Sequence, residues 1–182
     1  MNKFLLFSLL PISLGTILSG VIFPQQTAST LKLFVSPPLF AQSTSSSQQN
    51  LGQMLPVTAQ TILGGEVIQL EVTRTPRQQQ LGLMYRTSLP DNRGMLFPFP
   101  TPQVVGFWMK DCKISLDMIF IRDGVIQAIQ DSAPPCIQDP CPTYGPAVPV
   151  DQVIELRGGR SQELGLKPGD RVKIEAINSD PS

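Results

Sequence analysis

Proline and glycine divide the chain after about residue 56 into short apolar runs, and this spacing restricts the possible folds. Proline has no backbone N–H and breaks helices, so the stretch 97–103, which contains three prolines, is expected to be an extended surface connection. The apolar runs are β-prone and are bounded by turn signals. The sequence therefore predicts a mainly-β domain, a compact sandwich or barrel of short strands with one or two short helices.

Local patterns position individual elements along this domain. Two β-prone runs on either side of a Gly-Gly pair predict a hairpin over 61–72. Thr75, followed three residues later by Gln78, is a capping-box pattern and predicts a short helix that ends at Gly82. Further strands are expected at 95–97, 104–109, 116–121, 125–130, 153–156 and 171–177, with a hairpin turn at 122–124, a helical turn at 161–164 and a type II turn at 167–170.

The N-terminus has the pattern of a targeting segment. Lys3 precedes an apolar run from 4 to 23, and small residues follow, which predicts a signal peptide over 1–41 and an exported protein, periplasmic or secreted. Cleavage is expected after Ala41, with Ala28 as the alternative site. An uncleaved membrane anchor is the competing interpretation, because the run approaches the length of a spanning helix. A disordered lead-in is expected over 42–56, a single β-rich domain over 57–178 and a tail over 179–182.

Composition excludes several classes of function. Fourteen basic and fourteen acidic residues balance, and no basic cluster stands out, so no nucleic-acid partner is expected. The chain has no histidine, which excludes Ser-His and Cys-His catalysis and every His-ligated metal site. We therefore expect neither a metal nor a cofactor. Membrane contact is expected only if the N-terminal segment remains uncleaved.

Three cysteines are present. Cys136 and Cys141 lie in a proline-rich loop, and in an exported protein such a pair is expected to form a disulfide. A redox pair or a set of metal ligands is the alternative. Cys112 is then the odd thiol. It is either a small buried side chain, a partner for one of the other two cysteines, or a nucleophile whose pKa Lys110 or Lys113 lowers.

Charged residues within the apolar stretch 106–121 suggest a binding pocket. Asp117 stands between apolar residues, where an unpaired carboxylate would be costly, so it is either paired or accepts backbone N–H bonds. The functional interpretation is a ligand pocket with three charged contacts and three apolar walls: Arg86, Lys110 and Asp117, with Met84, Trp108 and Tyr144. The structural interpretation is an ion pair beside core aromatics. Glu155 and Asp170 complete the carboxylates considered, and Glu155 with Asp117 is a possible glycosidase-like pair.

Six fragments, taken in order, resemble the domain-of-unknown-function 192 family, also called uncharacterised protein family 0127. They are LGLMYRTSLP, GMLFPFP, FWMKDCKISLDMIFI, PPCIQDPCPTYGP, VIEL and LGLKPGD, and the resemblance covers about residues 66–177. It implies a compact β sandwich or barrel and no particular activity. One departure stands out: the family's motif continues after FWMK with Asn-Thr, where this chain has Asp111 and Cys112.

These observations favour an exported β domain that binds a small molecule, a peptide or an envelope partner without covalent chemistry. The alternative is an enzyme that uses Cys112 as a nucleophile, or Asp117 with Lys110 as an acid/base pair.

Overall fold

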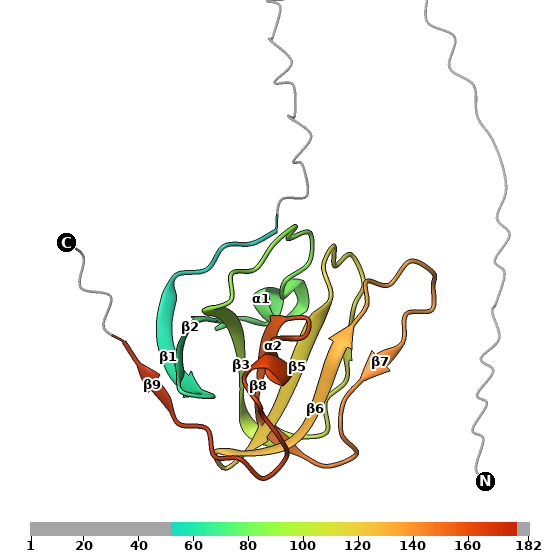
Figure 1. Ribbon diagram of the computed structural model, residues 1–182. Coiled ribbons are helices and arrows are strands. Elements are labelled where there is room, and N and C mark those ends of the chain that lie inside the picture. Colours follow the sequence, from blue (N-terminus) through green and yellow to red (C-terminus); the bar gives the residue numbers. More distant parts are fainter. Residues whose placement is uncertain (1–51, 178–182) are drawn as a thin grey trace, which may run out of the picture. The chain divides into compact units, whose positions relative to one another are not determined.

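The computed structural model describes residues 52–177, so the expected signal peptide or anchor, the lead-in up to residue 51 and the tail lie outside the described residues. Figure 1 shows the elements, all labelled except β4. Their bounds are β1 (Val57–Leu63), β2 (Glu66–Val72), α1 (Pro76–Leu81), β3 (Arg93–Gln103), β4 (Phe107–Trp108), β5 (Leu116–Arg122), β6 (Val125–Ala133), β7 (Thr143–Tyr144), β8 (Val150–Arg157), α2 (Arg160–Glu163) and β9 (Ile174–Ala176). Within this part of the chain, no helix has the length and apolar character to cross a membrane.

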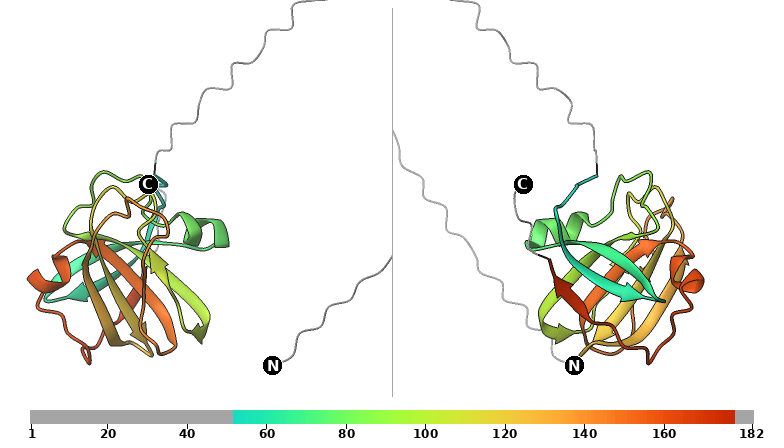
Figure 2. Two further views of the ribbon diagram at one scale, coloured as in Figure 1. Left: turned by 90° about the vertical axis from the view of Figure 1, so that its right-hand side faces the viewer. Right: turned by 60° about the vertical axis from the view of Figure 1, so that its left-hand side comes forward.

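The prediction of a mainly-β fold is confirmed. Seven strands form one mixed sheet in the order β6-β5-β8-β3-β2-β1-β9, in which β2 and β3 run parallel and the other neighbours are antiparallel. The strands β4 and β7 form a separate two-stranded sheet. Figure 2 shows that the large sheet is strongly curved. It does not close into a barrel, because β6 and β9 at its two edges do not pair as strands.

Residues 169–177, which we call the closing segment, bond to both edges of this sheet. At one edge the Gly169 N–H donates to the Ile126 carbonyl (2.8 Å), and the Val172 N–H donates to the Gly124 carbonyl (2.9 Å). At the other edge β9 pairs with β1. One short stretch of chain therefore supplies hydrogen-bond partners to two strands at opposite edges of the sheet.

The central strands are buried on both faces, which explains their long apolar runs. Side chains alternate between the faces, so Ile119 and Ile154 lie in one apolar cluster while Met118 and Val153 lie in another. The first cluster includes β1, β2 and Leu164, which follows α2. The second cluster is covered by the loops around 83–89 and 109–116. Such two-sided burial accounts for β5, whose six residues from Leu116 to Ile121 are all buried.

The predicted turns and the helix cap are present. Thr75 Oγ1 accepts from the Gln78 N–H, and Gln78 in turn accepts from the Thr75 N–H, which forms the capping box. Gly82 caps the C-terminus of α1 with a positive φ of 45°. In the 167–170 turn, Gly169 has a φ of 93°, as position three of a type II turn requires.

Three strand predictions were wrong in extent. The run 104–109 forms only the two-residue strand β4, because its partner β7 is itself only two residues long. The C-terminal run forms only β9, because residues 169–172 turn toward β6 instead. Conversely, β3 continues through the proline-rich stretch to Gln103, with an irregularity in its pairing to β8 between Pro98 and Gln103.

Candidate functional site

The Asp117 carboxylate accepts hydrogen bonds that stabilise the fold. Its side chain is fully buried on the face of the sheet that α2 covers, and it accepts three backbone N–H bonds, from Ser132 (2.7 Å), Gly159 (2.8 Å) and Ser161 (2.6 Å). The Ser161 hydroxyl donates a fourth hydrogen bond to Asp117, at 2.6 Å. The carboxylate therefore ties β5 to the end of β6 and to the first turn of α2, which has no side-chain cap of its own.

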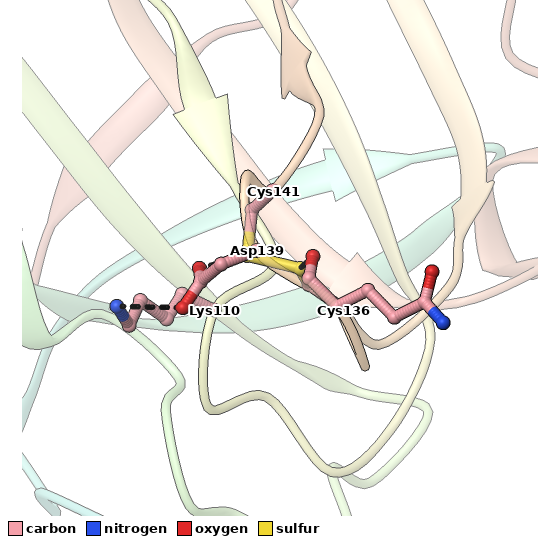
Figure 3. The surroundings of a disulfide bond; sticks show 5 residues. Lys110, Cys136, Asp139 and Cys141 are labelled. Carbon is pink, nitrogen blue, oxygen red and sulfur yellow. Dashed lines mark hydrogen bonds and ion pairs between the residues drawn. A yellow bond between two sulfur atoms is a disulfide. The ribbon is translucent and has the colours of Figure 1, made fainter.

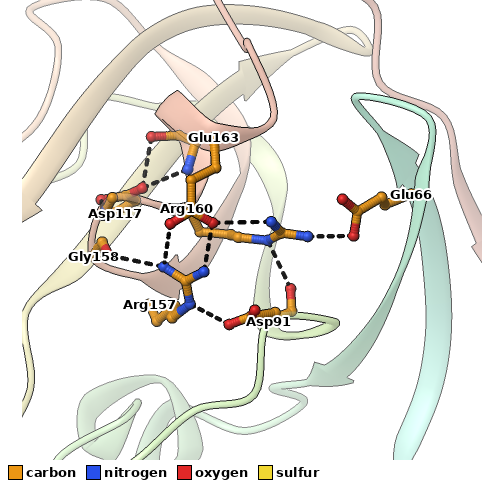
Figure 4. A network of polar contacts seen from close by, with 9 residues as sticks. Glu66, Asp91, Asp117, Arg157, Gly158, Arg160 and Glu163 are labelled. Carbon is orange, nitrogen blue, oxygen red and sulfur yellow. Dashed lines mark hydrogen bonds and ion pairs between the residues drawn. The ribbon is translucent and has the colours of Figure 1, made fainter.

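Arg157 and Arg160 extend this polar region away from Asp117 (Figure 4). Arg157 pairs with Asp91 and with Glu163 (2.5 Å), and Arg160 pairs with Glu163 (3.0 Å) and with Glu66. The hydrogen bonds from Arg157 hold the pKa of both Asp91 and Glu163 below their usual values. This network joins β2, the turn before β3, β8 and α2.

Arg86 forms a buried ion pair with Glu71 that stabilises the fold. Its guanidinium contacts both carboxylate oxygens of Glu71, at 2.8 and 2.5 Å, and both side chains are buried. It also donates to the Gln53 carbonyl through Nε at 3.0 Å. The same carboxylate of Glu71 accepts the Leu55 N–H at 2.8 Å, so this pair fastens residues 53–55 onto the domain.

Lys110 lies at the surface beside the loop that the Cys136–Cys141 disulfide closes. Its ammonium is 5.7 Å from the centre of the Trp108 ring and 3.7 Å from Asp139, which lies inside the loop closed by the Cys136–Cys141 disulfide (Figure 3). The structure thus contains the expected disulfide. The Lys110–Asp117 pair of the enzyme alternative is not formed: among described residues Lys110 pairs with Asp139, because the chain turns at 110–111 and leaves Lys110 outside β4.

The structure therefore does not assemble the six expected pocket residues into one site. Arg86 lies in a separate hollow beside Thr87 and Leu89. Tyr144 pairs through its backbone with Phe107, in the β4–β7 sheet. Only Met84 and Trp108 border one common cavity. A glycosidase-like pair of Asp117 and Glu155 is excluded as well, because their side chains lie on opposite faces of the sheet, Asp117 beside Leu156 and Glu155 beside Met118.

Cys112 is buried in the second apolar cluster. Burial, followed by the nearby acidic groups Glu155 and Asp111, raises the pKa of its thiol to about 12, and Lys113 offsets this only in part. The thiolate needed for nucleophilic chemistry is therefore disfavoured at neutral pH. The preceding Asp111 has a φ of 57°, a conformation that Asn and Asp tolerate better than most residues, so both the family's Asn and this Asp suit that backbone.

Glu155 is the unusual residue of this face. It belongs to β8, and its neighbours on β3 and β5 are Met95 and Met118, both fully buried. Its own exposure is 4%, and its Oε2 has no hydrogen-bond partner within residues 52–177. Burial raises the pKa of this carboxyl to about 8. Glu155 is thus mostly protonated at neutral pH, as a carboxyl without a cationic partner must be in an apolar setting.

A small cavity of about 30 Å³ lies against Glu155. Gly82 closes one side, and a Cβ there would lie 3.7 Å from Glu155 Oε2 and 3.4 Å from the Phe97 ring. The remaining lining comes from α1, the loop after it, β3, β4 and the loop after β4: Gln79, Gln80, Leu81, Leu83, Met84, Phe97, Phe107, Trp108 and Cys112. Within residues 52–177 no group of three or more His, Cys, Asp or Glu side chains is arranged to hold a metal.

A wider hollow of about 320 Å³ adjoins this cavity and opens to the surface. The two share the same five lining residues, namely Gln79, Gln80, Phe97, Phe107 and Trp108. The hollow is bordered further out by residues 103–106, where Val104 is 61% exposed. We call Phe97, Phe107 and Trp108, the three aromatic residues that line both spaces, the aromatic passage, and Glu155 lines only the smaller cavity.

Sequence reasoning considered Glu155 but did not place it at the site, and it missed Gln79, Phe97 and Phe107. The signal for Glu155 was present, since it is the one charged residue in VIEL, a run that is buried throughout. The aromatic residues gave no signal of their own, because the pattern of a core residue and that of a pocket wall are the same in sequence.

Fold and site together define a class: a small domain built on one curved mixed sheet, with a buried acid that has no partner in the described part of the chain and lies beside an aromatic hollow. Residues 58–174 match the DUF192 family, described as "Uncharacterized ACR, COG1430", and the chain belongs to this family. It is similar to a solved protein of unknown function from Novosphingobium aromaticivorans, at 35% identity and a TM-score of 0.58, over 64% of this chain and 83% of that one.

It is also similar to a Sinorhizobium meliloti 1021 protein that is named as a proposed transcription regulator. The identity is 33% and the TM-score 0.59, over 67% of this chain and 97% of that one. A comparison with curated proteins found no match.

Proposed function

We propose that this protein is a binding domain that takes a small molecule, or one slender end of a larger partner, in the hollow above Glu155, and that it makes no covalent bond to it. The proposal rests on one observation: Glu155 Oε2 is buried without a hydrogen-bond partner among residues 52–177, beside a cavity that shares lining residues with a surface hollow. Buried polar atoms normally have a hydrogen-bond partner, so an orphaned one in a reachable cavity marks a place where a ligand group fits.

The candidates for covalent chemistry are poorly placed. The Cys112 thiol has a raised pKa, and Glu155, the one carboxyl among the described residues that line the same cavity, raises that pKa further instead of activating the thiol. Asp117 is occupied by its N–H donors and Lys110 by Asp139. These contacts support binding over the enzyme alternative.

The proposal places the protein outside the cytoplasm, as a periplasmic or secreted domain. The Cys136–Cys141 disulfide supports an oxidising compartment, in line with the N-terminal sequence. The name of the Sinorhizobium relative does not lead us to propose a nucleic-acid partner for this chain, because its balanced charge gives no support for phosphate binding.

A fragment screen tests the proposal. Anionic, neutral and cationic fragments of a few heavy atoms are added to ¹⁵N-labelled protein, and shifts are followed at the Trp108 indole N–H and at the side-chain amides of Gln79 and Gln80. We expect at least one class to shift these signals, and Trp108→Ala to weaken binding. Ile137→Ala, a change at a 91% exposed residue away from the lining, is the control and should have no effect. If no class reaches these residues at millimolar concentration, the hollow is not a binding site.

A further inference from the structure

We infer that the ligand of this site carries a terminal primary ammonium group on a slim apolar stem, and that the ammonium enters the small cavity and pairs with the carboxylate of Glu155. This inference rests on the proposed function, and it specifies the chemical class of the ligand. Its support comes from three independent properties of the site, which are charge, the chemistry of the walls, and size.

Charge is the first property. Among the described residues that line the cavity, Glu155 is the only acid and there is no Lys or Arg, while Cys112 is the only other ionisable side chain. Glu155 comes from β8. The elements packed against it are β3, β5, α1 with its following loop, and the 109–115 loop, and of their residues at the cavity only Cys112 can titrate. A carboxylate in this position lacks a positive partner, and a buried charge is stable only when it is paired.

The walls of the passage are the second property. Phe97 and Phe107 meet edge to face, with ring centroids 5.0 Å apart, and Trp108 borders the same passage. Aromatic faces attract ammonium groups and pack against methylene chains, whereas the negative potential of a ring face disfavours an anion. An ammonium that passes these rings would therefore keep a favourable contact while it loses water.

Size is the third property. The cavity of about 30 Å³ has room for a group the size of a water molecule or an ammonium, and not for a guanidinium with its three nitrogens. The adjoining hollow of about 320 Å³ accommodates the body of the ligand. The part of the ligand that connects its ammonium group to its body lies between the five shared lining residues, so it must be narrow. An unbranched alkyl chain is narrow enough.

The number of protons released on binding follows from the protonation state of Glu155 before the ligand binds. Glu155 is mostly protonated at pH 7, and an ammonium brings its own full set of protons. Forming the ion pair therefore turns the carboxylic acid into a carboxylate and releases one proton to solvent, with no bond made to the ligand. A neutral hydroxyl or amide group bound at the same place would release none.

The test is calorimetric titration of the protein near pH 7 with n-pentylamine and n-pentanol, in phosphate and in HEPES, two buffers of different ionisation enthalpy. We expect the amine to bind at least about tenfold more tightly than the alcohol, because a hydrogen bond to a charged group is worth more than a neutral one. Its binding should release close to one proton. Blocked lysine, N-acetyl-lysine N′-methylamide, distinguishes a free amine from a lysine side chain of a peptide: equal or tighter binding than pentylamine indicates a peptide source.

Two variants localise the effect. Glu155→Gln should lower the affinity for pentylamine by about tenfold to a hundredfold, abolish proton release and leave pentanol binding nearly unchanged. Glu175→Gln, which removes a half-exposed carboxylate on β9, should change nothing and controls for loose association of amines with the surface. If Glu155→Gln does not fold, Glu155→Met, which matches its neighbours Met95 and Met118, takes its place. Proton release by the unaltered protein tests the inference without any variant.

The outcomes separate the two proposals. Equal binding of amine and alcohol, amine binding without proton release, or full amine binding by Glu155→Gln each overturns the ammonium inference and leaves the binding function in place when fragments still reach the hollow. Absence of binding by amine, alcohol and every fragment overturns both.

Discussion

Replacing Glu155 with Gln should change how the stability of the protein depends on pH. The amide keeps the shape of the side chain and cannot ionise, so the variant removes one titration from an otherwise intact core. In the folded protein burial raises the pKa of Glu155 from its ordinary value of 4.5 to about 8. In the unfolded chain the carboxyl is in water and returns to its ordinary value.

The sign of the effect follows from proton binding. Between about pH 4.5 and pH 8 the folded protein holds a proton on Glu155 that the unfolded chain has lost, so stability falls as pH rises. The slope is about 1.4 kcal/mol per pH unit. Over the whole window the loss amounts to roughly 3–5 kcal/mol, and it is complete above about pH 8. The full stabilisation is present below about pH 4.5.

The assay is urea unfolding at intervals between pH 5 and pH 8.5, for the unaltered protein and for Glu155→Gln. The comparison isolates Glu155, because the chain has no histidine to titrate in this range and the Cys112 thiol, whose burial raises its pKa in the folded protein, is present in both proteins. We expect the free energy of unfolding of the unaltered protein to fall relative to the variant by more than 2 kcal/mol across this range. Parallel curves would refute the reasoning, since they would mean that Glu155 is charged in the folded protein or paired within it.

Three further predictions concern structural contacts, each measured as a change in urea unfolding. Asp117→Ala should cost about 3 kcal/mol or more, because it leaves several buried donors without an acceptor; a cost below about 1 kcal/mol contradicts the capping role. Arg86→Met should cost about 3–5 kcal/mol by leaving Glu71 buried and unpaired, and the double change with Glu71→Leu should recover much of this; an additive double variant argues against a coupled pair. Reducing the Cys136–Cys141 disulfide should cost about 2 kcal/mol and alter the environment of the β4–β7 sheet; unchanged stability on full reduction shows that the loop is fixed by its other contacts.

The sequence predicted the fold class and most of the turns because these depend on local chemistry. A Gly-Gly pair, a capping box and a Lys-Pro-Gly-Asp turn each need few residues, and the structure contains all three. Strand ends were harder, because they depend on the partner. The run 104–109 has the apolar character of a strand, but the strand stops where β7 stops.

The site was the least predictable part for the same reason. Lys110 and Asp117 are seven residues apart in sequence, yet the turn after β4 and the pleat of β5 direct them to different places. Conversely, Glu155 and Gly82 are far apart in sequence and meet only because the loop after α1 folds over β8. The sequence identified the unusual residues. Which of them lie close together depends on the register of the strands in the sheet.

The closing segment has a consequence for how this chain reaches its native state. Its residues 169–177 are the last of the domain to leave a ribosome, and the strands to which they bond include β1, the first to emerge. Both edges of the sheet therefore stay open until residues 169–177 have been synthesised. Exposed edges invite pairing with other chains, so the growing polypeptide depends on its surroundings for protection during that interval. Completion of the fold is therefore tied to synthesis of the closing segment, because among the described residues only this segment bonds to β1 and to the β6 side of the sheet at once.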